Sequence, residues 1–250
     1  MSGPVLDDEK VMSLTEHLTE LRRRLIISLA AITVGSVIGW FAAPRAIEIL
    51  RAPIIPYYNR PLVFTQPGAA FFLELKLALM IGVALAAPIV LYQLWAFVSP
   101  GLTPQERRVA RPWVPLAVLF LILGIGVAYL ILPFAMGFLL SFQVPGSIEP
   151  LLTLESYFGF VTGLFLAFGL VMQFPIALVL LSKTGLVSVE RLKRNRRYVA
   201  LAIIVFAVLA TPGGDPFSPT IMALVMYPLY ELSIYLIGRS ERPTTTQTGS

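Results

Sequence analysis

Residues 77–98 read LALMIGVALAAPIVLYQLWAFV, a stretch of 22 residues without a single charge. A helix that crosses a bilayer needs roughly 20 predominantly apolar residues, because each residue rises about 1.5 Å and the hydrocarbon core is about 30 Å thick. This stretch therefore predicts a membrane-spanning helix. Similar stretches lie on both sides of it, so lipid is the solvent that decides the fold.

Five further stretches complete an all-α, polytopic membrane protein with six predicted transmembrane helices. They are Leu25 to Ala43, a run from Pro112 to near Leu140, Ser156 to Ser182, Tyr198 to Thr211, and Pro216 to Gly238. The stretch from Tyr198 to Thr211 has only 14 residues, which is short for a membrane span. We predict one six-helix transmembrane domain over residues 1–238. It includes a cytoplasmic helix at about 13–24, and a disordered cytoplasmic tail follows at 239–250.

The composition limits what the chain can do. It is 57% hydrophobic and 13% charged, whereas soluble domains carry about 25% charged residues. Cysteine is absent and His17 is the only histidine, which argues against a thiolate site or a multi-histidine metal site. No phosphate-binding loop, G-x-S-x-G or H-E-x-x-H motif occurs. We therefore expect no cofactor, no metal, no nucleic-acid partner and no enzymatic activity.

The basic residues predict the orientation in the membrane. Lys and Arg are retained in cytoplasmic loops because they resist translocation. If the N-terminus is cytoplasmic, 15 of the 19 basic residues fall on the inside. The exceptions are Arg45, Arg51, Arg60 and Lys76, which starts the second span. Both termini are therefore predicted to lie in the cytoplasm, and the protein in the cytoplasmic membrane.

Acidic and polar groups near or inside a membrane are costly, so each is a candidate functional residue. By spacing alone, Glu20 pairs with Arg23 or Arg24 one turn further along its helix. Glu106 completes a capping box with Thr103. Gln173 has the spacing to hydrogen-bond a neighbouring helix, and Glu231 to pair with a basic loop residue, so for these two a structural and a functional role both stay open.

Two other patterns have structural interpretations. Gly35 and Gly39, like Gly159 and Gly163, form small-xxx-small patterns that let membrane helices approach closely, and internal packing is the favoured explanation. The basic cluster from Arg191 to Arg197 is interpreted as an anchor that contacts anionic lipid headgroups.

Several sequence blocks together resemble one family. The first is EHLTELRRRL at residues 16–25, and the second is APIVLYQLWAFVSPGL at residues 87–102. Shorter matches follow the same order as in the family: residues 52–54, 106–108, 168–169, 174–175, 211–212 and Asp215. The chain resembles TatC, the multi-spanning subunit of the twin-arginine protein translocase, from about residue 13 to about residue 238.

The resemblance implies a glove-like, concave receptor that recognises the paired arginines of signal peptides on folded cargo. It places recognition carboxylates at Glu20 and Glu106, and it adds Arg22, Phe97 and Pro53 to the signal-peptide site. It implies partner or membrane contacts at a second set of polar residues: Gln173, Thr211, Asp215 and Glu231.

The resemblance also implies partners and an energy source. The partners are small single-span Tat subunits, further copies within a larger complex, and membrane lipid, and export is driven by the proton-motive force. This chain departs from many members of the family by carrying Gln173 where they have Glu, and from some by carrying Pro219 where they have a polar residue.

Two other functions are alternatives for a chain of this composition. A small secondary transporter predicts ionisable groups at the membrane midplane and an internal repeat. Here the acidic residues lie toward the cytoplasmic surface, and the two halves show no convincing repeat. A membrane enzyme is a more distant alternative, because no nucleophile–base pair or metal-ligand set occurs.

Overall fold

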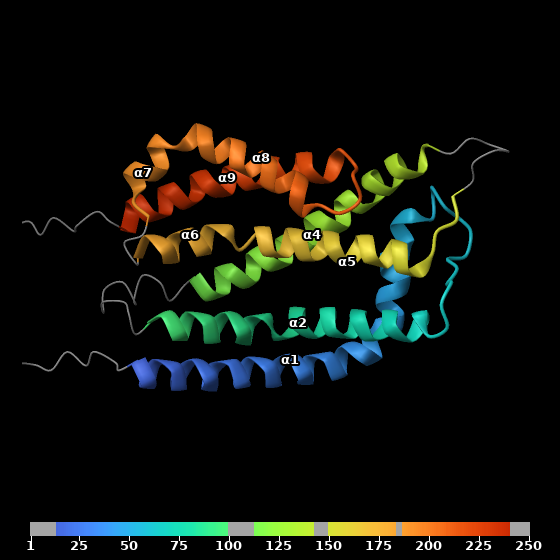
Figure 1. The fold of residues 1–250 in the computed structure, drawn as a ribbon, viewed down its shortest axis with the longest axis horizontal. Coiled ribbons are helices and arrows are strands. Elements are labelled where there is room, and N and C mark those ends of the chain that lie inside the picture. The colour runs from blue at the N-terminus through green and yellow to red at the C-terminus, as the bar shows by residue number, and fades with distance from the viewer. Residues whose placement is uncertain (1–13, 100–112, 143–149, 184–186, 241–250) are drawn as a thin grey trace, which may run out of the picture.

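The computed structural model describes residues 14–99, 113–142, 150–183 and 187–240, and in these ranges the chain is a bundle of helices (Figure 1). The only β-type pairing in the described part is an isolated bridge between Val63 and Thr153. The helices are α1 (Leu14–Arg51), the short 3₁₀ helix η1 (Ala52–Ile54), α2 (Ala69–Val98), α4 (Trp113–Leu140), α5 (Leu154–Val171), α6 (Phe174–Lys183), α7 (Val189–Arg194), α8 (Arg196–Ala210) and α9 (Phe217–Ser240).

Five helical segments of the described chain are long and apolar enough to cross a membrane. They are Thr15–Ile54, Ala69–Phe97, Val114–Leu140, Leu154–Ser182 and Phe217–Gly238. They correspond to five of the six predicted spans, and the all-α membrane fold is confirmed. The remaining stretch forms α8, whose 15 residues are fewer than a full span needs. The sixth crossing therefore stays a prediction.

The first helix is longer than predicted at both ends of its span. The helix expected at about 13–24 is continuous with the first span, because α1 runs without interruption from Leu14 through Arg22, Arg23 and Arg24 into the apolar stretch. It also continues past Ala43 to Arg51, with Pro44 inside it. A proline within a helix lacks the N–H that would bond the carbonyl four residues earlier, which bends the helix. Figure 1 shows the last turns of α1 crossing the end of the bundle.

The predicted fourth span is two helices. The bonding changes at the end of α5, where the N–H of Gln173 donates to the carbonyl of Leu170 rather than to that of Gly169. The helical pattern resumes when Ala177 N–H donates to the carbonyl of Gln173. Pro175 explains the break, because its ring has no N–H and would clash with the carbonyl of Val171.

Helices α1 and α2 pack as a close pair. A Cβ atom added at Gly39 would lie 2.4 Å from the carbonyl oxygen of Ala78, and one added at Gly82 would lie 2.3 Å from Oγ of Ser36. The two backbones therefore meet with no room for a side chain. This confirms internal packing for the Gly35–Gly39 pattern. In the Gly159–Gly163 pattern, only Gly163 meets a neighbour, the ring of Pro212.

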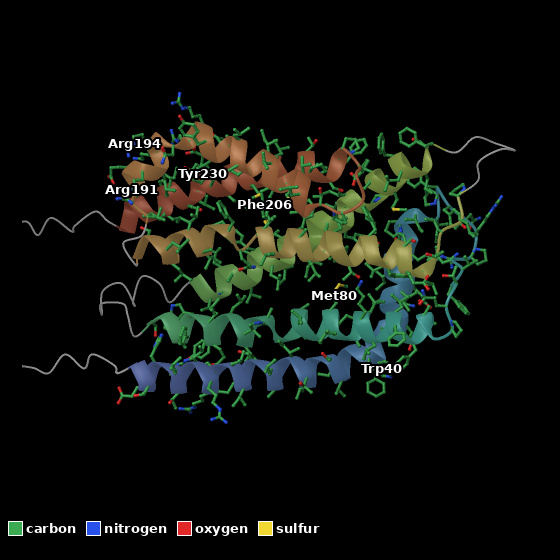
Figure 2. The ribbon with its side chains drawn as sticks, in the orientation of Figure 1. Trp40, Met80, Arg191, Arg194, Phe206 and Tyr230 are labelled. Carbon is green, nitrogen blue, oxygen red and sulfur yellow. The ribbon has the colours of Figure 1, made fainter. Side chains whose placement is uncertain are left out.

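The main core lies in the other half of the bundle, between α4, α5, α6 and α9. Its largest fully buried side chains include Tyr157, Phe158, Phe168 and Tyr230. An apolar cavity of about 410 Å³ lies between the α1–α2 pair and helices α4 and α5. Met80 of α2 lines the cavity and lies in the space between α2 and α5 (Figure 2).

Candidate functional site

An acid, a base and an amide meet where the beginning of α1 lies against the end of α2. Arg24 donates to Oε1 of Glu20 from two nitrogens, Nε at 3.0 Å and Nη2 at 2.6 Å. Its third nitrogen, Nη1, donates to Oε1 of Gln93 on α2 at 3.1 Å. The Glu20 and Arg24 side chains are 17% and 25% exposed, so this ion pair is partly desolvated. The predicted pairing of Glu20 with a nearby arginine is confirmed, with Arg24 as the partner.

The second carboxylate oxygen of Glu20 is left without a hydrogen-bond donor by its described neighbours. Oε2 is shielded from solvent and accepts no hydrogen bond from the described residues. A carboxylate can accept several hydrogen bonds, and leaving a buried acceptor unpaired costs about 1–3 kcal/mol. The cluster therefore holds an acceptor oxygen that would gain from a donor brought by another molecule.

An aromatic contact lies beside this cluster. The rings of His17 and Phe97 stack with their centroids 4.5 Å apart and their planes inclined by 26°. His17 is exposed, and Arg22 on the same helix is exposed as well. Of the residues that the resemblance assigns to signal-peptide binding, the structure brings Glu20, Arg22 and Phe97 to one end of the α1–α2 pair.

The two other residues of that set are not in this cluster. Pro53 lies in η1, beyond the far end of α1. Along α1, the distance from Glu20 to Arg51 is roughly 45 Å at 1.5 Å per residue. The structure therefore does not bring Pro53 together with Glu20. Glu106, with the capping box predicted for it, lies outside the described residues.

Gln173 occupies the break between α5 and α6. Its Nε2 donates to the carbonyl of Ala117 on α4 at 3.1 Å, which confirms the predicted hydrogen bond to a neighbouring helix. Its Oε1 is buried and has no partner among the described residues. The side chain also lines the apolar cavity and contributes nearly its only polar group.

The remaining predicted polar residues all have local partners. Thr211 donates to the carbonyl of Ala207 at 2.9 Å, and Oδ1 of the buried Asp215 accepts from the N–H of Ser218 at 2.7 Å, close to the start of α9. Glu231 accepts from Arg196 at 2.7 Å, so its predicted pairing with a basic residue is confirmed. These contacts give each residue a structural role, whatever partners it also has.

Gln93 is the member of the cluster that spacing did not single out. It lies 69 residues from Arg24 in the sequence, so no helical periodicity links the two. The available signal was its position in the block at residues 87–102, which carries an amide in an otherwise apolar and aromatic run.

Fold and site together define a class of protein. Long apolar helices cross the lipid, and the part of the chain that the structure describes has no group of three His, Cys, Asp or Glu residues placed to hold a metal ion. The charged cluster lies at one end of the bundle, where α1 begins and α2 ends. This is the arrangement of a polytopic membrane receptor.

Comparisons with known proteins identify the family. A family model described as "Sec-independent protein translocase protein (TatC)" matches residues 16–224. The protein of that name from Carboxydothermus hydrogenoformans is 37% identical over 231 residues, covering 92% of this chain and 94% of the relative. The protein of that name from Escherichia coli K12 is 35% identical over 230 residues, covering 91% of this chain and 88% of the relative.

Solved structures agree with the sequence relatives. A crystal structure described as the twin arginine translocase receptor TatC in DDM has a TM-score of 0.75 and is 36% identical, covering 88% of this chain and 99% of that chain. The chain therefore belongs to the TatC family of Sec-independent protein translocase proteins. It is a multi-pass protein of the cytoplasmic membrane.

Proposed function

We propose that this chain is the signal-peptide-recognising core subunit of the twin-arginine translocase, and that it exports folded proteins across the cytoplasmic membrane. The observation that carries the proposal is the partly buried carboxylate of Glu20, whose Oε2 has no donor among the described residues. A guanidinium group of a signal peptide supplies the missing donor. The family and the solved relatives, described as twin arginine translocase receptors, support the same function.

Carboxylates suit this ligand for a physical reason. Arginine presents a planar fork of N–H groups that matches a carboxylate, whereas lysine presents a compact point charge. Two carboxylates can therefore read two adjacent arginines and discriminate against lysines. Glu106, predicted to lie on the adjacent cytoplasmic segment, is the second carboxylate of the proposal, and Arg22 and Phe97 are its further contacts.

The energy for transport comes from outside the chain in this proposal. The sequence contains no nucleotide-binding motif, and we propose a transport role without catalysis. A membrane potential supplies about 2.3 kcal/mol per charge per 100 mV. We therefore propose the proton-motive force as the source of the energy for export.

We propose that α8 is the docking element for small single-span Tat subunits. Its 15 residues extend for about 22 Å, less than the hydrocarbon thickness of about 30 Å. Leu201, Ile204 and Val208 on its surface are all exposed. A partner helix beside α8 would cover these side chains and relieve the mismatch, which costs fractions of a kcal/mol per Å. Larger assemblies of several copies are part of the same proposal.

Peptide binding tests the recognition site directly. Glu20→Ala and Glu106→Ala should each weaken binding of a twin-arginine peptide to the purified protein by about 2–5 kcal/mol, because one member of a desolvated ion pair is lost. Glu106→Arg should bind still more weakly through charge repulsion. A surface ion pair of no functional consequence contributes only about 0–1 kcal/mol.

Thermal stability provides the control in that experiment. Each variant should insert into membranes and unfold within a few degrees of the parent protein. Unchanged peptide affinity in both alanine variants would assign the two carboxylates to local structure and contradict the proposal. A Glu48→Ala variant is a matched control, because Glu48 forms an exposed one-turn ion pair with Arg45 on the same helix.

A further inference from the structure

Arg24 holds only one of the two oxygens of Glu20. An arginine and a carboxylate frequently form two parallel hydrogen bonds, one to each oxygen. Here Nε and Nη2 of Arg24 both donate to Oε1, at 3.0 and 2.6 Å, and Oε2 receives no donor from the described residues. In this ion pair Oε1 of Glu20 accepts both hydrogen bonds from Arg24, and Oε2 accepts none.

Gln93 accounts for this one-sided geometry. Its Oε1 accepts from Nη1 of Arg24 at 3.1 Å, so all three nitrogens of the guanidinium group have an acceptor while Oε2 of Glu20 is left alone. The contact comes from α2, whose position against α1 is set by the close approach at Gly39 and Gly82. The orientation of Arg24 is thus determined by a helix other than its own.

We propose that Gln93 is a positioning residue for signal-peptide recognition. By holding Nη1 of Arg24, it keeps the guanidinium group on Oε1 of Glu20 and reserves Oε2 for an arginine of the signal peptide. This inference rests on the proposed function, in which Glu20 binds such an arginine.

Loss of the amide would change the competition for Glu20. Without Gln93, Nη1 of Arg24 has no acceptor within this partly buried cluster, and an unpaired donor there is costly. Arg24 can recover a partner by turning its fork to bind both oxygens of Glu20. It then occupies the oxygen that the signal peptide needs, so the receptor blocks its own site.

The variant Arg24→Lys distinguishes the positioning role of Gln93 from a purely structural contact between α1 and α2. Lysine carries one compact ammonium group and has no planar fork with which to cover both oxygens. In the absence of Gln93, Arg24→Lys should therefore reopen Oε2. If Gln93 only fastens the helices, Arg24→Lys removes a further contact and can restore nothing.

The experiment measures affinity of the purified full chain for a twin-arginine peptide and for the same peptide with both arginines replaced by lysine. Gln93→Leu should weaken twin-arginine binding roughly 10-fold or more, the effect of one hydrogen bond to a charged group. Binding of the twin-lysine peptide should change much less. Adding Arg24→Lys to Gln93→Leu should restore most of the lost twin-arginine affinity. Gln66→Leu, which makes the same chemical change in an exposed residue far from the cluster, is the control.

The possible outcomes separate the inference from the function on which it rests. Normal binding by Gln93→Leu, when Glu20→Ala does not bind, overturns the positioning role and leaves the recognition site intact. A Gln93→Leu loss that Arg24→Lys fails to restore, or that follows a fall in thermal stability, overturns it as well. Normal binding by Glu20→Ala overturns the proposed function itself.

Discussion

Two tyrosine hydroxyls complete the backbone bonding at the end of α1. Pro53 has no N–H, so the carbonyl of Ile49, four residues earlier, lacks its helical donor. The hydroxyl of Tyr129 on α4 donates to that carbonyl at 3.3 Å. The hydroxyl of Tyr157 on α5 donates to the next carbonyl, that of Leu50, at 2.5 Å in a buried position. The end of α1 is therefore fastened to the main core by side chains.

The buried hydrogen bond of Tyr157 should contribute more to the free energy of unfolding than the exposed one of Tyr129. Tyr157→Phe removes the only donor described for the Leu50 carbonyl in a dry environment, so it should lower the free energy of unfolding by about 1–3 kcal/mol. Tyr129→Phe is the matched control: its hydrogen bond is longer and solvent-accessible, so its loss should cost less than about 1 kcal/mol. Unfolding of the purified variants in detergent measures both. Equal stability of Tyr157→Phe and the parent would contradict this account of the helix end.

At the residue scale, local pairs were predictable from the sequence and distant ones were not. Glu20 and Arg24 are one helical turn apart, so their pairing follows from periodicity. Glu231 and Arg196 are 35 residues apart, but the predicted topology places both near the same surface. No feature of the sequence predicts the hydrogen bond from Arg24 to Gln93, because it depends on the axial register between α1 and α2.

At the scale of whole helices, hydropathy predicts that a membrane-spanning helix is present better than it predicts where that helix begins, breaks or ends. The predicted end near Leu140 coincides with the end of α4, and five of the predicted spans are present as long apolar segments. The misplaced boundaries all occur at proline or at charges. The helix passes through Pro44 in α1 but breaks just before Pro175. Proline weakens a helix in both places, and tertiary packing decides whether it bends or ends.

The α1–α2 pair depends on glycine at the crossing point. A Cβ atom at position 82 would lie 2.5 Å from the backbone nitrogen of Ser36 and 2.6 Å from its Cα, so the backbones must separate to admit it. Gly82→Ala should therefore destabilise the protein by about 1–3 kcal/mol through overpacking. Because the same pair positions Gln93 against Arg24, the variant should also weaken twin-arginine peptide binding.

Gly126 of α4 provides the matched control for this substitution. A Cβ atom there meets nothing within 4 Å, so Gly126→Ala adds no clash and removes a flexible residue from a helix. It should be neutral or stabilise by about 0.5–1 kcal/mol. The comparison uses thermal unfolding of both variants in the same detergent. Equal effects of the two substitutions would show that helix propensity, and not close packing, governs Gly82.

On the scale of the whole molecule, charge is distributed unequally between the two ends of the bundle. The described chain begins with α1 and ends with α9 at the same end, and Arg191 and Arg194 lie there as well (Figures 1 and 2). The turn between η1 and α2 and the turn between α8 and α9 lie toward the opposite end. Because basic residues are retained in the cytoplasm, the end that carries Arg191 and Arg194 is predicted to be cytoplasmic.

Labelling of single cysteines should settle both the orientation and the number of crossings. The chain contains no cysteine, so each introduced thiol is the only one. Asn59, Asn195 and Pro216 are exposed, and they lie in the first outer turn, between α7 and α8, and in the turn before α9. In intact cells, a membrane-impermeant maleimide should label Asn59→Cys and Pro216→Cys but not Asn195→Cys, which should react only after the cells are opened. Labelling of Asn195→Cys alone would reverse the orientation. Protection of Pro216→Cys with Asn59→Cys labelled would mean that the short α8 does not cross the membrane, because the turn that follows it would not reach the outer surface.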